Sequence, residues 1–319
     1  MPFDHQQPPL LFGEVLFDCF PDGAEVLGGA PFNVAWHLAA FGLEPVFVSR
    51  VGEDALGERI DAAMREQGMT TLGLQRDPEH PTGTVQVSLS NGEPSYEIVP
   101  DRAYDYIDAA ALPPLPEQAL LYHGSLALRQ SVSADALRAL RGRIAPAAFL
   151  DVNLRDPWWH KEQLVELLEA ATWVKLNADE LRVLAPEGQT DDDVETRARR
   201  VLERYELEAV FATLGADGAC ALAADGERSR VAPAGDIQVV DAVGAGDGFA
   251  SVLILGLMRR WPLPQTLARA QAFASAIVGQ RGATTRDPAF YQPFLADWGL
   301  VDGGLAHEGQ AGGDLTGGA

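Results

Sequence analysis

One glycine-rich stretch, DAVGAGDGFAS at residues 241–251, places a carboxylate at a position suited to chemistry. A strand is expected at 236–240 and an apolar helix at 249–260, so the turn Gly244-Ala245-Gly246 stands at a helix N-terminus. Backbone N–H groups are free there, and the helix dipole favours an anion. Beside such an anion, Asp247 suits a general base that accepts a proton from an attacking hydroxyl. By itself, the pattern also fits a glycine-rich helix start in which Asp247 only complements the dipole.

A second polar group follows another expected strand, in DVNLRDPWW at 151–159. The guanidinium of Arg155 supplies a rigid charged fork that suits a phosphate. The alternative is a surface salt bridge from Arg155 to Asp156 or Glu162. The chain contains neither the G-x-x-x-x-G-K-[ST] loop of Walker-type nucleotide sites nor a G-x-G-x-x-G dinucleotide fingerprint. A Rossmann oxidoreductase is therefore disfavoured.

The charge of the 319-residue chain limits its partners. It has 46 acidic and 24 basic residues, a formal net charge of −22. Such a surface repels nucleic acid, and binding of a polyanion requires locally concentrated positive potential. The apolar runs are too short to span a membrane, and the N-terminus does not resemble a secretory signal. Cys19 and Cys220 form neither a disulfide framework nor a ligand cluster. We expect a cytoplasmic protein with no membrane partner.

The elements that must position these residues alternate along the chain. Apolar strands are expected at 10–20, 44–52, 119–125, 147–153, 171–177 and 209–215. Helices are expected between them at 31–42, 54–68, 133–143, 158–170, 178–185 and 191–206. Continuous apolar strands alternating with amphipathic helices predict an α/β fold whose mostly parallel sheet is covered on both faces.

Two segments break this alternation. Residues 82–99 alternate with period two around Asn91-Gly92, which predicts a tight hairpin, and Pro21-Asp22-Gly23 predicts a turn within 18–29. Together, about 18–29 and 82–107 predict a small β sheet that serves either as a flap over a ligand or as an edge decoration. We expect one domain over 1–302 and a glycine-rich, disordered tail at 303–319.

Two motifs resemble a known family. DAVGAGD is similar to the D-T-x-G-A-G-D signature of the ribokinase-like (phosphofructokinase B-type) sugar kinases, although Ala242 replaces the threonine. The segment GGAPFNVAWHLAAFGLEPVFVSRVGEDALGERI at 28–60 resembles the family's other signature. The resemblance extends from about Gly13 to about Gly282. It implies a ribokinase-like fold, with a Rossmann-like sheet between helices and a small β lid, and an ATP-dependent sugar kinase activity.

The resemblance also implies a role for each matching position. It makes Asp247 the catalytic base, with Arg155 at the phosphate and an anion hole formed by the N–H groups of Gly244, Ala245 and Gly246. It implies sugar contacts at Asp18, Gly28, Gly29, Ala30 and Asn33, and ATP contacts at Asn177, Thr213, Gly215, Gly218 and Ala274. From spacing alone, Asp18 would be a turn former, Asn33 a cap-region residue and TLGADGA (213–219) only a β-turn.

Two cations follow from the same resemblance. Mg²⁺ would arrive with ATP and be held through its water shell by Glu180, the acid of the N-x-x-E motif in KLNADEL, 175–181. From composition alone, Glu180 would be an exposed helix-start residue. K⁺ would be held by Asp241 and the backbone oxygens of Val243, Ile277, Gln280 and Gly282. Arg286 stands where small or hydroxylated residues are common, and its guanidinium could replace the potassium ion.

The fructokinase-like features GEVLFD, GGAPFNVA and DVNLR imply transfer of the γ-phosphoryl group of ATP to fructose. A kinase for 2-keto-3-deoxygluconate, another ketose or a nucleoside is the alternative within the family. The alternative to an enzyme is a catalytically silent protein that senses sugars. Acceptor choice is expected to depend on lid residues such as Tyr96, Arg102 and Tyr104, and the lid is expected to form a homodimer interface.

Overall fold

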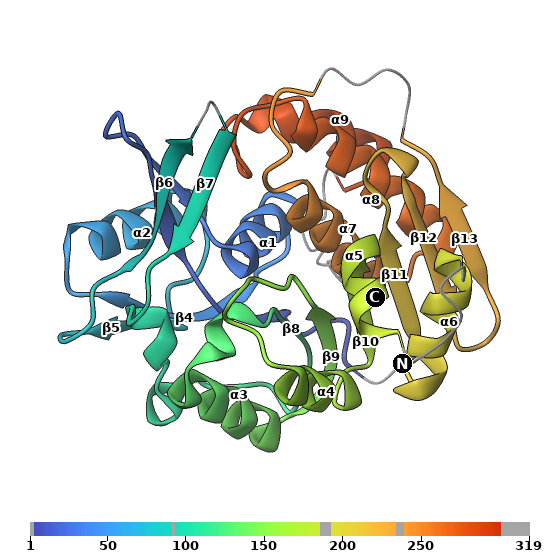
Figure 1. The fold of residues 1–319 in the computed structure, drawn as a ribbon, viewed down its shortest axis with the longest axis horizontal. Helices are drawn as coiled ribbons and strands as arrows, with labels where there is room; N and C mark the ends of the chain where they lie inside the picture. Colours follow the sequence, from blue (N-terminus) through green and yellow to red (C-terminus); the bar gives the residue numbers. More distant parts are fainter. Residues whose placement is uncertain (1–2, 91–92, 186–192, 234–238, 301–319) are drawn as a thin grey trace, which may run out of the picture.

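The computed structural model describes residues 3–90, 93–185, 193–233 and 239–300, and two sheets are formed within these ranges (Figure 1). The larger sheet has nine strands in the order β13-β12-β11-β10-β9-β8-β1-β4-β5. Their bounds are β1 (Leu10–Phe12), β4 (Val46–Gly52), β5 (Leu74–Asp77), β8 (Gln118–His123), β9 (Ala145–Asp151), β10 (Trp173–Asn177), β11 (Ala209–Thr213), β12 (Ala219–Ala223) and β13 (Arg228–Val231). Pairing is parallel from β5 to β11 and antiparallel only at β11-β12-β13. The predicted α/β fold class is confirmed.

Helices cover both faces of this sheet (Figure 1). One face carries α1 (Ala30–Ala40), α7 (Ala245–Arg259), α8 (Leu263–Val278) and α9 (Pro288–Asp297). The other carries α3 (Ser131–Arg143), α4 (Lys161–Glu169), α5 (Ala178–Leu184) and α6 (Val194–Arg204). The remaining helix, α2 (Ala55–Glu66), follows β4. None of the helices within the described ranges is long and apolar enough to cross a membrane.

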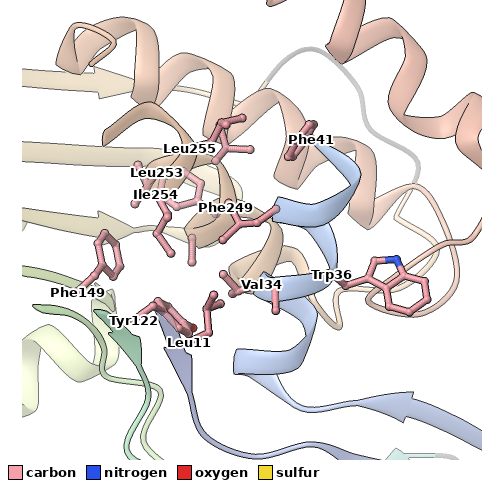
Figure 2. Close-up of a cluster of buried hydrophobic side chains, with 14 of the residues drawn as sticks. Leu11, Val34, Trp36, Phe41, Tyr122, Phe149, Phe249, Leu253, Ile254 and Leu255 are labelled. Atoms are coloured by element: carbon pink, nitrogen blue, oxygen red, sulfur yellow. The ribbon is translucent and has the colours of Figure 1, made fainter. Parts of the chain in front are cut away.

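The alternation of side chains along each strand divides the core in two. Leu11 and Phe149 point to the α1 and α7 face, whereas Leu10, Phe12 and Leu150 point to the opposite face. Figure 2 shows the first of these clusters, where Val34 of α1 and Phe249 of α7 lie over Leu11 and Tyr122. Strands buried on both faces need continuous apolar runs, which explains why the sequence predicted them well.

The expected strand at 10–20 is divided into two strands. After β1 the chain turns at Gly13 and continues as β2 (Leu16–Cys19), which belongs to the smaller sheet. Gly13 has a φ of +151°, and a Cβ there would lie 2.5 Å from Cγ of Pro31. Because the chain passes this close to Pro31 at the start of α1, only a residue without a Cβ fits between the two strands.

The smaller sheet has the order β3-β2-β6-β7, with β3 (Glu25–Gly28), β6 (Gly83–Ser90) and β7 (Glu93–Ile98). β2 and β3 pair antiparallel across the turn expected at Pro21-Asp22-Gly23, and β6 and β7 pair as the expected hairpin. The hairpin turn Asn91-Gly92 lies outside the described residues, as does the expected tail at 303–319. That this sheet acts as a lid stays a prediction.

Some expected element bounds were wrong. Helix α7 begins at Ala245 rather than 249, so Asp247 lies inside its first turn. Val239 and Val240, expected in a strand, are not in one, and 236–238 lie outside the described residues. Expectation had also left β5, β12, β13, α8 and α9 unassigned. β5 and β13 are short strands at the two edges of the larger sheet, and β12 is a short buried strand beside β13. Helix α8 covers residues 263–278.

Candidate functional site

The candidate site lies where the C-terminal ends of β9 and β10 meet the first turn of α7, with α1 alongside. In open α/β sheets, ligands bind at the carboxyl ends of the strands. Each element delivers one polar side chain, from Asn33 on α1, Asp151 on β9, Lys175 on β10 and Asp247 on α7.

The turn before α7 requires glycine at its first position. Gly244 caps the helix with a left-handed φ of +81°, and no side chain caps the helix N-terminus. A Cβ on Gly244 would lie 2.3 Å from Cβ of Ala283, so the two backbones are in close contact. In this first turn the N–H group of Ala245 donates to the carbonyl oxygen of Ala242 over 3.4 Å, and that of Gly248 donates to the carbonyl oxygen of Gly244 over 2.8 Å. The N–H groups of Gly246 and Asp247 have no hydrogen-bond partner within the described residues, which is the arrangement an anion hole needs.

His37, which sequence reasoning did not single out, fixes the other side of this contact. Its Nε2 lies 3.0 Å from the carbonyl oxygen of Ala283 and its Nδ1 lies 3.0 Å from the hydroxyl of Tyr291. Since a carbonyl can only accept, Nε2 donates. Burial lowers the pKa of His37 to about 4, so the neutral ring accepts from Tyr291 through Nδ1. A histidine within an apolar helix face was the available signal.

Asp247 is held by one hydrogen bond from α1. Nδ2 of Asn33 donates to Oδ2 of Asp247 over 2.8 Å. Burial raises the pKa of Asp247 to about 6; Asp151 acts in the same direction, whereas the Asn33 hydrogen bond, Lys175 and Arg155 act against it. A carboxylate with a pKa near 6 is ionised at neutral pH yet basic enough to take a proton. The structure brings the predicted base and the predicted sugar contact Asn33 together.

A buried ion pair lies behind Asp247 and was not predicted. Nζ of Lys175 lies 2.9 Å from both Oδ1 and Oδ2 of Asp151, and the two residues face each other across β10 and β9. The hydroxyl of Tyr122 donates to Oδ2 of Asp151 over 3.1 Å. A lysine inside the apolar strand TWVKLN was a usable signal, because lysine is rarely buried without a partner.

The sugar contacts expected near the smaller sheet lie beside the same site. Burial raises the pKa of Asp18 to about 6, Arg155 opposes that shift, and a Cβ on Gly28 would lie 3.7 Å from Oδ2 of Asp18. Gly29 has a φ of +110°, and a Cβ there would lie 2.7 Å from the carbonyl oxygen of Glu14, which fixes the entry into α1 at Ala30.

Arg155 is exposed, and the alternative interpretation, an ion pair with Asp156 or Glu162, is not formed within the described chain. Asp156 instead accepts a hydrogen bond from Nε1 of Trp159 over 2.7 Å. The guanidinium lowers the pKa of Glu14, Asp18 and Asp247. The positive charge of Arg155 therefore acts on the carboxyl groups of the site, and binding of a phosphate requires such a positive charge.

Glu14 is a further residue that sequence reasoning missed. It lies at the junction of β1 and β2, is 3 % exposed, and its Oε2 has no hydrogen-bond partner within the described residues. Burial raises its pKa to about 7, and the charge of Asp247 acts in the same direction. The motif GEVLFD contained the signal, a carboxylate amid apolar residues.

Two of the lid residues expected to select the acceptor, Tyr96 and Tyr104, differ in how far they are exposed. Tyr96 on β7 is 50 % exposed; burial raises its pKa, and so do the charges of Asp18 and Asp241. Tyr104 is fully buried against the guanidinium of Arg129, and its hydroxyl has no partner within the described residues. Tyr104 packs into the core of the smaller sheet, and the dependence of acceptor choice on these lid side chains stays a prediction.

The residues expected to bind Mg²⁺ and ATP lie at the start of α5 and along β11. Oδ1 of Asn177 accepts from the N–H groups of Asp179 and Glu180, each over 2.9 Å. Glu180 is 6 % exposed, with Oε1 accepting from Leu154 N–H and Oε2 from Asn177 N–H, each over 2.8 Å. Glu180 is thus not an exposed helix-start residue. Each of its oxygens accepts one backbone donor, which leaves a lone pair on each oxygen. Contact of Glu180 with Mg²⁺ through water stays a prediction.

The other expected ATP contacts lie on both sides of this sheet edge. Thr213 ends β11, and Gly215 and Gly218 shape the turn into β12, where a Cβ on Gly218 would lie 1.9 Å from the carbonyl oxygen of Val231. Ala274 is 7 % exposed inside α8. Their contact with ATP stays a prediction.

Hydrogen bonds link some of the residues expected to hold potassium, and their binding of the ion stays a prediction. Oδ1 of Asp241 accepts from Val243 N–H over 3.0 Å and Oδ2 accepts from Gly282 N–H over 3.1 Å. The carbonyl oxygen of Ile277 accepts from Gln280 N–H over 3.0 Å. These contacts occupy both carboxylate oxygens. No group of three or more acidic, histidine or cysteine residues able to hold a metal occurs within the described ranges.

Arg286 does not take the place of a potassium ion. Its Nη1 lies 2.6 Å from Oε2 of Glu66, near the end of α2, and both side chains are exposed. The alternative raised for this residue was wrong, because an acidic partner on a neighbouring element draws the guanidinium to the surface.

Comparison with known proteins identifies the family of this chain. Residues 20–289 match the family described as pfkB family carbohydrate kinase. The chain is 30 % identical over 262 residues to a fructokinase of Escherichia coli, covering 77 % of this chain and 83 % of that one. It is also 30 % identical over 276 residues to an aminoimidazole riboside kinase of Salmonella typhimurium, covering 82 % and 84 %.

A solved structure has the same fold. The fructokinase of Vibrio cholerae, determined with fructose, ADP and calcium ion bound, superimposes with a TM-score of 0.74 at 24 % identity, covering 91 % of this chain and 99 % of that one. The family match covers far more than half of the chain. Together with the site geometry, it shows that the chain belongs to the pfkB family of carbohydrate kinases and is an ATP-dependent sugar kinase.

Proposed function

We propose that this enzyme is a fructokinase that transfers the γ-phosphoryl group of ATP to fructose, giving fructose 6-phosphate. The observation that carries the proposal is Asp247 in the first turn of α7, hydrogen-bonded to Asn33 beside an uncapped helix N-terminus. The 30 % identity to a fructokinase supports fructose as the acceptor.

In the proposed reaction, Asp247 takes the proton from the sugar hydroxyl. The freed oxygen lone pair forms a bond to the γ-phosphorus of ATP, and the bond from that phosphorus to the bridging oxygen breaks. Its electron pair remains on the β-phosphate of ADP, and the proton on Asp247 passes to solvent after release. The first-turn N–H groups of α7 and Arg155 stabilise the charge on the phosphoryl oxygens.

Mg²⁺ would enter as the ATP complex, held by phosphates and water, with Glu180 as the outer contact. When bound, it neutralises phosphate charge. A potassium ion would lie beside Asp241, the residue that ties the turn before α7 to Gly282. The neighbouring Vibrio cholerae structure contains ADP with calcium ion, which supports metal-dependent use of the nucleotide.

A nucleoside acceptor is the second candidate. The aminoimidazole riboside kinase is as similar to this chain as the fructokinase is, at 30 % identity. Both acceptors present a hydroxyl to the same base, so the choice depends on side chains around the sugar. The half-exposed ring of Tyr96 is one such side chain.

The test is ADP release from Mg-ATP with fructose, ribose, aminoimidazole riboside or 2-keto-3-deoxygluconate, comparing the native enzyme with Asp247→Ala. We expect turnover with fructose that falls by at least about 10²-fold in the variant. Turnover with another acceptor only would replace fructose and keep the mechanism. A well-folded native protein that uses none of them would leave a sugar-sensing role.

We also propose a homodimer formed through the smaller sheet. β3 and β7 are its edge strands within the described residues, and exposed strand edges pair readily with other chains. Light scattering coupled to size-exclusion chromatography measures the mass directly, and a monomer at micromolar concentration would contradict the proposal.

A further inference from the structure

Lys175 is a buried cation whose charge acts on Asp247. The chain has only two lysines among its 24 basic residues, Lys161 at the exposed start of α4 and Lys175 in β10. Lys175 is 7 % exposed and lies on the sheet face covered by α1 and α7. Burial of a lone ammonium would be costly, so its position needs an explanation.

The ammonium group has one donor to spare. A lysine head carries three N–H donors, and two are directed at Oδ1 and Oδ2 of Asp151, each 2.9 Å away. Tyr122 donates to the same carboxylate over 3.1 Å, which fixes the acceptor side of the pair. No further acceptor contacts Nζ within the described residues.

The spare donor is next to the anion-hole turn. A Cβ added to Gly246 would lie 3.4 Å from Nζ of Lys175, so the ammonium stands directly beside the first turn of α7. Its charge also acts on Asp247, whose pKa it lowers. The net charge of −22 requires a local source of positive potential for ATP, and Lys175 supplies one on a rigid strand.

We propose that Lys175 is a catalytic residue whose third N–H donates to a non-bridging oxygen of the γ-phosphoryl group as it passes Gly246, while Asp151 and Tyr122 hold the ammonium in place. This inference rests on the proposed kinase reaction. The lysine moves no proton; it stabilises charge that builds up on the transferring group. Pairing with Asp151 raises the pKa of Lys175 against the effect of burial, so the head stays charged.

The experiment must separate this role from the structural role of a buried pair. Lys175→Met alone leaves the Asp151 charge unpaired, which is destabilising. The informative variant is Lys175→Met combined with Asp151→Asn, because both charges go and packing volume is kept. Lys161→Met provides the same substitution at an exposed position.

We expect the double variant to fold with a thermal midpoint near the native one, and its kcat to fall by roughly 10²–10³-fold with KM for the sugar little changed. Binding of ADP with aluminium fluoride, a mimic of the transferring phosphoryl group, should weaken far more than binding of ADP alone. Lys161→Met should match the native enzyme in both measurements.

The outcomes can be distinguished from failure of the proposed function. A folded double variant that keeps kcat within about threefold, or that loses ADP and ADP–fluoride binding equally, overturns the role of Lys175 but not the kinase reaction. A native enzyme that turns over no acceptor overturns both.

Discussion

The two ends of the site differ in whether their buried side chains are paired with one another. At the phosphoryl end, Asp151 and Lys175 direct their charged atoms at each other. At the acceptor end, Oε2 of Glu14, Oδ1 of Asn33 and the hydroxyl of Tyr104 are buried with no partner within the described residues. A buried unpaired group is costly, so such groups await a ligand or an ordered water.

The difference follows from where each end is built. The phosphoryl end stands on neighbouring strands of the main sheet and on the first turn of α7, so its geometry is set before any ligand arrives. The acceptor end stands where β1 leaves the main sheet for the smaller one, near Glu14. We infer that the reaction is fixed by the first region and the choice of sugar by the second.

The largest expected effect tests the tight packing of the phosphoryl end. Gly244 and Gly42 both have a φ of +81°, but a Cβ on Gly42 has nothing within 4 Å, whereas on Gly244 it would meet Ala283 at 2.3 Å. Gly42→Ala should cost about 1–2 kcal/mol for the left-handed backbone alone. Gly244→Ala should cost about 1–3 kcal/mol more from overpacking and lower kcat by about 10²-fold or more.

Urea unfolding and steady-state kinetics on both variants check this prediction. If Gly42→Ala and Gly244→Ala lower the free energy of unfolding equally, the added methyl group at residue 244 meets no overpacking against Ala283. The tight packing inferred for the phosphoryl end would then be wrong.

The next effect is the pH dependence of the base. Asp247 acts when ionised, and its pKa is raised to about 6. The value of kcat/KM should therefore fall about tenfold per pH unit below pH 6 and reach a plateau above it. The native profile can also contain Glu14, whose pKa is about 7.

Glu14→Gln separates the two carboxyl groups. The acid limb near pH 6 should persist in that variant if it belongs to Asp247. A profile that loses this limb would assign it to Glu14 and move the titrating group to the acceptor end.

The smallest expected effect comes from replacing a tyrosine by phenylalanine at each end of the site. Tyr122→Phe removes a hydroxyl that donates to Asp151, so it should destabilise the fold by about 1–3 kcal/mol. Tyr104→Phe removes a hydroxyl with no partner within the described residues and should leave stability unchanged or raise it by up to about 1 kcal/mol. Calorimetry measures both. If Tyr104→Phe lowered stability as much as Tyr122→Phe, the Tyr104 hydroxyl would have a hydrogen-bond partner. The proposed difference between the two ends of the site would then be wrong.

The sequence predicted the parts of this protein that depend on local patterns. Apolar runs located β1, β4, β8, β9, β10 and β11 because strands buried on both faces admit few polar residues. The motif DAVGAGD predicted the position of the turn before α7, because the left-handed backbone of this turn at Gly244 favours glycine. The strands β5, β12 and β13 escaped prediction because strands of four or five residues give only a weak sequence pattern, and β5 and β13 are also partly exposed.

What the sequence by itself determined was the α/β fold, the family and the position of Asp247 in a helix start. Only the tertiary structure decided that Lys175 pairs with Asp151, residues 24 positions apart that neighbouring strands place face to face. It likewise decided that Asn33 holds Asp247 across 214 residues and that Tyr104 is buried. Local sequence patterns indicate the secondary structure and turns of a single segment. The contacts between distant residues depend instead on which strands are neighbours and which helix covers them.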